Sequence, residues 1–317
     1  MDIDISKTAS IRKAFGNALA ELGKINPQIV VMDADLSCST QTKIFADKFP
    51  ERFFNSGIAE QDMIATASGL ASEGKIPFVS SFAMFATGRT YDQIRNAVCY
   101  PELNVKIIGT HGGITVGEDG ATHQALEDIA LMRAIPHMTV IVPADSKECS
   151  EAIKYAGLHK GPMYIRISRC NVPDIFDENY HFNIRKAIVV KEGSDIALFT
   201  NGETLAQAVI MANELEKEGI SIKVINVPVV KPLDIDTVVE CAKTTKFVVT
   251  VENHSIIGGL GSAICEALCT KYPTKIFRIG INDEFGQSGK SDELMNYYGL
   301  DSISLKNRIK TLYDKNK

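Results

Sequence analysis

The sequence lacks the features that mark membrane proteins and nucleic-acid-binding proteins. No apolar run approaches the roughly 20 residues that a helix needs to cross a bilayer, so no contact with a membrane is expected. With a formal net charge of −5 the chain has no basic excess, and nucleic acid is not an expected partner. The first residues, Met1–Ile5, are acidic and do not resemble a secretory signal.

Cysteine motifs are also absent. The seven cysteines are odd in number and none belongs to a CxxC pair, so neither a disulfide framework nor a metal site is predicted. Cys265 and Cys269 lie one helical turn apart in an apolar pattern, which favours packing in a hydrophobic core. These observations indicate a reduced protein, and we expect it to be cytoplasmic.

The pattern that is present is an alternation of strands and helices. The chain has 317 residues, 45% of them hydrophobic and 23% charged, which is enough for about two globular domains. Apolar runs of strand length alternate with helical patterns in both halves, and a polar stretch from Asn171 to Asn183 interrupts them. We therefore predict an α/β fold of two consecutive α/β domains with largely parallel sheets, at 1–170 and 186–317, joined by a linker at 171–185.

The expected strands are continuous apolar runs, which are typical of parallel strands buried on both faces. They lie at 28–32, 52–54, 76–81, 105–109, 139–142, 163–167, 196–200, 222–227, 247–251 and 275–279. In such sheets, ligands bind beyond the carboxyl ends of the strands. The first expected helix runs from Ser10 to Leu22, with Gly23 as a C-cap because glycine readily adopts the left-handed conformation that ends many helices.

Glu60 is an acidic residue near the start of an expected helix. The run Arg52-Phe-Phe54 reads as the end of a buried strand, a Ser-Gly turn follows, and the helix is expected from Ile58 onward. Two interpretations are open from this stretch alone. An acidic side chain stabilises a helix N-terminus by about 0.3–1 kcal/mol, or a buried acid handles a proton.

Two further groups of residues follow expected strands. The loop Thr110–Gln124 holds His111, His123, Asp119 and four glycines, a composition that suits binding of a polyhydroxylated substrate and acid–base chemistry. The alternative is a structured loop whose polar groups satisfy one another. Phe82 and Phe85 would share one face of a helix, either as ordinary core packing or as a flat slot for an aromatic heterocycle.

Taken together, these motifs resemble the transketolase family. The matching segments are, in order, Gly57-Ile-Ala-Glu-Gln61, the pair Phe82 and Phe85, Val116-Gly-Glu-Asp-Gly-Ala-Thr-His-Gln124 and Ser168-Arg-Cys-Asn-Val-Pro173. The resemblance covers nearly the whole chain. It matches only the carboxyl-terminal half of a full-length transketolase, which is a pyrimidine-binding domain followed by a smaller C-terminal domain.

The resemblance implies a role for each candidate residue on the cofactor side. Glu60 would hydrogen-bond the N1′ atom of the aminopyrimidine of thiamine diphosphate, and burial would let it share a proton with that nitrogen. Phe82 and Phe85 would pack on the pyrimidine ring, and Asp35 would lie beside the cofactor. One departure is visible, because Gly88 stands where a third aromatic residue is expected.

The resemblance also implies a substrate channel. His111 and His123 would line it, and Asp119 would contact a sugar hydroxyl. The groups that would hold the phosphate of a sugar phosphate are Arg12, Ser39, His111 and Arg169. Either arginine alone would be an ordinary surface charge, but together they form a credible anion site because guanidinium groups match phosphate oxygens.

The motif that binds the diphosphate in this family, Gly-Asp-Gly followed some thirty residues later by Asn, is not found in the sequence. The resemblance therefore implies one subunit of a split transketolase. An N-terminal partner subunit would hold the diphosphate and its Mg²⁺ or Ca²⁺, and an α₂β₂ assembly is expected. The implied reaction moves a two-carbon ketol unit from a ketose phosphate, or a ketose with a similar anionic group such as a sulfonate, to an aldose.

Three alternative functions remain open at this point. Two are other thiamine enzymes, namely the β subunit of a 2-oxoacid dehydrogenase and a relative of deoxyxylulose-phosphate synthase. The third is a non-catalytic regulatory module. In the second half of the chain, the turn Gly258-Gly-Leu-Gly261 suggests dinucleotide binding, but the third glycine of that motif is missing and strand–helix packing explains the turn better. His254 beside it is expected to be structural or interfacial.

Overall fold

A computed structural model describes residues 7–316 of the chain, so the N-terminal segment Met1–Ile5 lies outside the described residues. The first domain is built on a seven-stranded sheet in the order β12-β6-β7-β5-β4-β2-β3. Its parallel strands are β2 (Ile29–Asp33), β3 (Phe53–Asn55), β4 (Ile76–Phe82), β5 (Lys106–Thr110), β6 (Thr139–Ile141) and β7 (Met163–Ile167). The antiparallel strand at its edge is β12 (Val229–Lys231).

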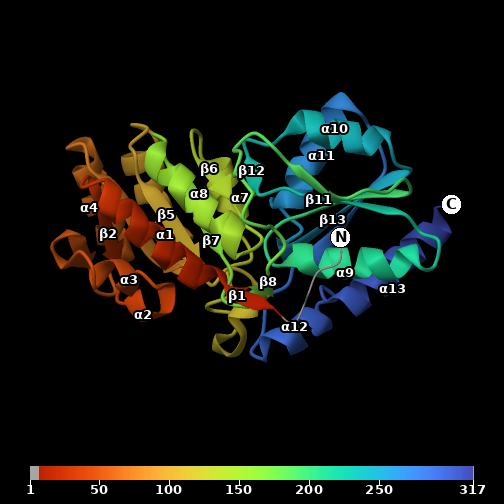
Figure 1. Cartoon of the computed structure of the whole chain (residues 1–317), viewed down its shortest axis with the longest axis horizontal. Helices are drawn as coiled ribbons and strands as arrows, with labels where there is room; N and C mark the ends of the chain where they lie inside the picture. The colour runs from red at the N-terminus through yellow and green to blue at the C-terminus, as the bar shows by residue number, and fades with distance from the viewer. Residues whose placement is uncertain (1–6, 317) are drawn as a thin grey trace.

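Helices cover both faces of the first sheet (Figure 1). One face carries α1 (Ile11–Ile25), α3 (Lys43–Ala46) and α8 (Ser146–Leu158). The other face carries α4 (Glu60–Ser72), α5 (Ala83–Thr87), α7 (Asp128–Ala134) and the π-helical η2 (Ile94–Cys99). Shorter connecting elements are α2 (Ser37–Thr40), η1 (Pro50–Arg52), α6 (Tyr91–Gln93) and η3 (Ile114–Asp119).

The second domain is a five-stranded sheet, also between two helical layers. Its order is β14-β13-β10-β11-β9, for β9 (Ile188–Lys191), β10 (Ile196–Thr200), β11 (Ile222–Asn226), β13 (Phe247–Ser255) and β14 (Ile276–Ile281). Only β9 is antiparallel among these five strands. Figure 1 shows α9 (Thr204–Glu216) and α13 (Ser302–Lys315) side by side on one face, with α10 (Ile235–Lys243) and α11 (Leu260–Lys271) on the other. The remaining helix is α12 (Ser291–Tyr297).

These observations confirm the predicted fold class of two α/β domains with mostly parallel sheets. Two short strands connect the parts of the chain in a way that the sequence pattern did not indicate. The predicted linker begins as β8 (Asn171–Pro173), which pairs antiparallel with β1 (Thr8–Ser10). In addition, β12 comes from the second half of the chain but pairs with β6 of the first sheet. The two domains are therefore joined by backbone pairing as well as by the chain itself.

The predicted end of the first helix was wrong. Helix α1 continues through Gly23 to Ile25, and Asn26 is its C-cap. A Cβ atom at position 23 would lie 2.5 Å from Phe45 Cε2 and 2.7 Å from Phe49 Cε2. Glycine is therefore required at this position for close packing of two phenyl rings, and it does not end the helix.

This packing gives a prediction about stability. We expect Gly23→Ala to lower the free energy of unfolding by about 1–3 kcal/mol, because overpacking outweighs the better helix propensity of alanine. Gly69→Ala in α4 is the matched control, since a Cβ there would meet nothing within 4 Å. The control should raise stability by up to about 1 kcal/mol. Urea denaturation of both variants measures the difference, and a stabilised Gly23→Ala protein would contradict the packing argument.

Three other expectations about local structure need correction. The strand before Glu60 is an edge strand with Phe54 44% exposed, because β3 is the last strand of the sheet. The helix after it begins at Glu60 and not at Ile58, whose side chain is 79% exposed. Cys269 is exposed and Cys265 only half-buried, so these two cysteines do not fill the core as predicted.

Candidate functional site

Glu60 is a buried acid at the first position of α4, with only 2% of its side chain exposed. The turn before it requires glycine, because Gly57 has a φ of +66°. Glu60 Oε2 lies 2.7 Å from Nη1 of Arg89. The expected burial of the carboxylate at a helix N-terminus is confirmed, and the structure adds a cation that the sequence did not lead us to expect.

Arg89 joins Glu60 to the aromatic pair. Its guanidinium carbon lies 4.5 Å from the ring centroid of Phe85, which is a cation–π distance. The Arg89 side chain is 44% exposed, so its contacts with Glu60 and Phe85 leave one side of it open to solvent. The sequence could have indicated the contact between Arg89 and Phe85, because residues four positions apart in an expected helix lie on the same face.

Phe82 and Phe85 stack on each other at the carboxyl end of β4. Their ring centroids are 6.1 Å apart and their planes differ by 17°. Both histidines of the 110–124 loop contact these rings, as the centroid of His111 lies 3.9 Å from that of Phe82 and the centroid of His123 lies 5.1 Å from that of Phe85. The aromatic pair and the two histidines thus form one group.

The predicted anion-binding residues also come together. Arg12 Nη1 donates to the backbone carbonyl of Ser39 at 2.7 Å, and Arg12 Nη2 donates to the carbonyl of Arg169 at 3.2 Å. Burial and then the charge of Arg169 lower the pKa of Arg12. No carboxylate within residues 7–316 forms an ion pair with either arginine. Two neighbouring guanidinium groups without a counter-charge form a local field that favours an anion.

His111 lies next to this field. Burial, with smaller contributions from the charges of Arg12 and Arg169, lowers the pKa of His111 to about 3. The imidazole is therefore neutral at pH 7. Its Nδ1 lies 2.9 Å from Oγ1 of Thr110, so the other ring nitrogen remains for a ligand.

The contacts form a continuous path from the acid to His111. It runs from Glu60 through Arg89, Phe85 and Phe82 to His111, and the charges of Arg12 and Arg169 act on His111. Glu60, the aromatic pair, His111 and Arg169 lie at or after the carboxyl ends of β3, β4, β5 and β7, which belong to one sheet with the order β7-β5-β4-β2-β3. This agrees with the rule for ligand sites in parallel sheets. Arg12 comes from the first turn of α1.

Two predicted residues, unlike His123 and Ser39, form no hydrogen bond, ion pair or ring contact with these groups within residues 7–316. Asp35 is exposed and its carboxylate accepts a hydrogen bond from Asn55 Nδ2 at 3.1 Å. Asp119 is exposed at the end of η3. A cavity of about 540 Å³, which Asp119 does not line, opens between the loop, which contributes Thr122 and Gln124, and the segment around Phe285 in the second domain. A small ligand would fit in this hollow.

The glycine turn in the second domain is already capped by a protein group. The Glu252 carboxylate accepts hydrogen bonds from the backbone N–H groups of Leu260 at 2.6 Å and Gly261 at 2.8 Å. This carboxylate occupies the position that a phosphate would take at the N-terminus of α11. His254 is fully buried, and its Nε2 accepts from the backbone N–H of Ala130 in the first domain at 3.4 Å.

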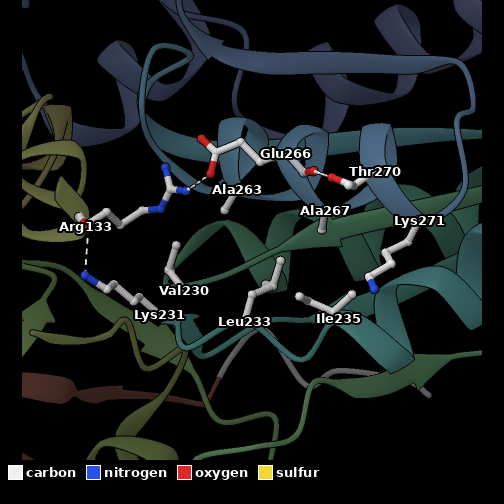
Figure 2. A pocket seen from close by; sticks show the side chains of 10 residues that line it. All are labelled: Arg133, Val230, Lys231, Leu233, Ile235, Ala263, Glu266, Ala267, Thr270 and Lys271. Carbon is white, nitrogen blue, oxygen red and sulfur yellow. Dashed lines mark hydrogen bonds and ion pairs between the residues drawn. The ribbon is translucent and has the colours of Figure 1, made fainter. Parts of the chain in front are cut away.

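A separate cavity of about 410 Å³ lies between α7, β12 and α11, and Figure 2 shows its lining. Its floor is apolar, with Val230 and Ala263 among the residues that form it. Two of its cations already have partners, because Arg133 pairs with Glu266 at 2.8 Å and Lys231 Nζ donates to the Arg133 carbonyl at 2.9 Å. None of the candidate site residues lines this cavity.

Neither a metal-binding cluster nor a membrane-spanning helix is found in the described part of the chain. Among residues 7–316, no group of three His, Cys, Asp or Glu side chains is arranged to hold a metal ion. In the same range, no helix combines the length and the apolar character needed to cross a membrane.

Comparison with known proteins identifies the class to which this fold and site belong. Residues 7–174 match the transketolase pyrimidine-binding domain, and residues 185–305 match the transketolase C-terminal domain. A putative transketolase C-terminal section from Methanocaldococcus jannaschii is 50% identical over 302 residues, which cover 94% of this chain and 95% of that protein. The 6-deoxy-6-sulfo-D-fructose transketolase subunit SqwH of Clostridium sp. (strain MSTE9) is 41% identical over 92% of this chain and 90% of its own length.

A solved structure agrees with this assignment. A split-gene transketolase determined as an inactive β4 tetramer superposes with a TM-score of 0.89 at 45% identity, covering 98% of this chain and all of that one. The chain belongs to the transketolase family, as the C-terminal section that comprises the pyrimidine-binding and C-terminal domains. The predicted family is thereby confirmed, and the family depends on thiamine diphosphate.

Proposed function

We propose that this chain is the C-terminal subunit of a thiamine-diphosphate-dependent transketolase. It moves a two-carbon ketol unit from an anionic ketose to an aldose, and it is active only with an N-terminal partner subunit. The observation that carries this proposal is the path of contacts from buried Glu60 through the aromatic pair to His111, on which the charges of the neighbouring Arg12 and Arg169 act. The path brings an acid, a flat apolar surface and an anion site into one group.

The chemistry of the residues around Glu60 fits an aminopyrimidine. A buried carboxylate at a helix start lies beside a pair of stacked phenyl rings, so a flat heterocycle with a basic ring nitrogen finds both an acidic partner and an apolar face. In this proposal the ring replaces Arg89, which contacts Glu60 and Phe85 in the chain alone. Because the Arg89 side chain is 44% exposed, it can turn outward when the ring enters.

In this proposal Glu60 holds and moves a proton at N1′ of the pyrimidine, while Phe82 and Phe85 orient the ring. Asp35 lies beside the cofactor on the Asn55 side of the site. When bound, thiamine diphosphate supplies the electron sink that cleavage of a carbon–carbon bond requires. The partner subunit holds the diphosphate and its Mg²⁺ or Ca²⁺.

The substrate is held by the other end of the path. Arg12 and Arg169, with Ser39 and His111, bind the anionic group of the sugar through charge-assisted hydrogen bonds. His111 acts as a neutral hydrogen-bonding group, which follows from its pKa of about 3. His123 exchanges protons with sugar hydroxyls. Asp119 contacts a hydroxyl group of the sugar.

The proposed partners are supported by the relatives. The split-gene transketolase of known structure was inactive as a β4 tetramer, which favours a requirement for a second kind of subunit here as well. Another relative, from Phocaeicola vulgatus, is named as one subunit of an apulose-4-phosphate transketolase, and SqwH is named for a sulfonated ketose. We propose an α₂β₂ assembly that accepts a phosphorylated or sulfonated ketose. A cytoplasmic location is part of the proposal.

The test is reconstitution with the N-terminal subunit from the same organism. The mixture, supplied with thiamine diphosphate and Mg²⁺, is assayed for transfer from fructose 6-phosphate, xylulose 5-phosphate or 6-deoxy-6-sulfofructose to an aldose phosphate. We expect transfer from at least one donor, and light scattering should give the mass of two copies of each subunit. Absence of ketol transfer from all donors by a well-assembled complex would overturn the proposal in favour of a non-catalytic module. Lipoyl-domain acylation from a 2-oxoacid would indicate a dehydrogenase β subunit.

A further inference from the structure

The loop that carries His111 and His123 is attached to the second domain by a buried amide. Asn253 in β13 accepts a hydrogen bond at Oδ1 from the backbone N–H of Ile114 at 3.0 Å. Its Nδ2 donates to the Glu203 carboxylate, and Glu203 Oε1 also accepts from Oγ1 of Thr115 at 3.0 Å. Asn253 and Glu203 are only 3% and 7% exposed. One polar side chain of the second domain thus satisfies the backbone of the loop in the first.

The approach between loop and amide is close enough to demand glycine. Gly113 has a φ of +79°, and a Cβ atom at that position would overlap the side-chain amide of Asn253. The backbone of the loop therefore lies directly against Asn253. No larger side chain could separate the two without displacing one of them.

Two further contacts hold the same loop from the second domain. Ser291, at the start of α12, donates its hydroxyl to the carbonyl of Thr115 at 2.9 Å. Gln124 Nε2, at the end of the loop, donates to the carbonyl of Gln287 at 3.0 Å and to the carbonyl of Ile114 at 3.2 Å. The loop is therefore tied at its middle and at its end to residues far away in the sequence.

The same short segment also contacts the anion site. Arg169 Nη1 donates to the carbonyl of Val116, one residue after Thr115. A shift of the segment would move the guanidinium group that it holds, as well as His111 and His123 at its two ends. The second domain thus determines where these groups lie, although none of its residues belongs to the path from Glu60 to His111.

We propose that the C-terminal domain positions the substrate loop, and that Asn253 is the positioning residue for substrate binding. The inference rests on the proposed function for its kinetic consequence, but the attachment of the loop does not. Displacement of a binding group by about 1 Å can lower rates on the order of 10²-fold. For Asn253→Ala we expect a roughly 10–50-fold higher KM for fructose 6-phosphate, with kcat changed less than about threefold.

The first experiment measures hydrogen exchange of peptides that cover residues 110–124 in the full-length chain alone. In Asn253→Ala the Ile114 amide loses its acceptor, so we expect exchange in this segment to be at least about tenfold faster. Thr115→Val, which removes the hydroxyl, should act in the same direction, while Thr115→Ser should behave as the parent protein. Thr250→Val is the matched control, because Thr250 is buried on the same strand and its hydroxyl has no partner within residues 7–316.

The second experiment measures KM and kcat of the same variants in the complex with the partner subunit. Unchanged exchange in both Asn253→Ala and Thr115→Val would overturn the inference, and so would faster exchange with an unchanged KM. If Asn253→Ala fails to fold, Thr115→Val and its serine counterpart still decide the outcome. A parent complex without ketol transfer would refute the proposed function instead, and faster exchange in that case would still support attachment of the loop.

Discussion

Replacing Glu60 by glutamine is expected to lower kcat for ketol transfer in the reconstituted complex by about 10²–10⁴-fold. Glutamine keeps the size and the hydrogen-bonding reach of the side chain, but it has no proton that titrates. The side chain is 2% exposed and its Oε2 lies 2.7 Å from Nη1 of Arg89. The measurement is a steady-state assay at saturating donor and acceptor.

The control for this variant is Glu73→Gln at the other end of α4, where the side chain is exposed. It should retain the activity of the parent complex. Light scattering must show that both variants assemble with the partner, because a loss of assembly would mimic a loss of chemistry. If Glu60→Gln assembles and works within about threefold of the parent, then Glu60 does not handle a proton and only stabilises its helix.

Removing the paired guanidinium groups is expected to abolish recognition of the anion. For the double variant Arg12→Ala and Arg169→Ala, we expect KM for fructose 6-phosphate to rise by about 10²–10³-fold. A hydrogen bond to a charged group contributes about 1.5–3 kcal/mol, and each 1.36 kcal/mol corresponds to a factor of about ten. The two arginines are half-buried beside each other, and neither forms an ion pair with a carboxylate among residues 7–316, so together they suit an anionic ligand.

The comparison that isolates the anion uses fructose without phosphate as donor. Its kcat/KM should be low in the parent complex and should fall less than about fivefold in the double variant. Lys13→Ala is the matched control, since Lys13 is an exposed cation that follows Arg12 on the same helix. Equal losses for fructose and fructose 6-phosphate would show that the arginines maintain the structure and do not bind the anionic group.

Much of the fold and part of the site could be predicted because they depend on local sequence patterns. The strand at Ile196–Thr200 was predicted with its observed bounds, since an apolar run of strand length between turn residues has few alternatives. The stacking of Phe82 on Phe85 follows from their spacing at a helix start. The grouping of His111 with these rings follows from the rule that residues after parallel strands meet at one edge of the sheet.

The features that escaped prediction depend on contacts between distant parts of the chain. The local pattern predicts that Gly23 ends the helix, but glycine is required there because the phenyl rings of Phe45 and Phe49 pack against it. Arg89 belongs to the site because it donates a hydrogen bond to Glu60, which lies 29 positions earlier. Asn253 contacts the loop across 139 positions, and no pattern around it indicates such a partner. Periodicity and turn signals describe neighbours in the chain and carry no information about these pairs.

The division of the active site between two subunits is tested most directly by a continuous-variation experiment. The chain and its N-terminal partner are mixed in varying proportions at a constant total concentration, with thiamine diphosphate and Mg²⁺ in excess, and ketol transfer is measured. We expect no activity at either end of the series and a maximum at equal proportions. Activity of this chain alone, or a flat line at zero across the whole series, would contradict a divided site.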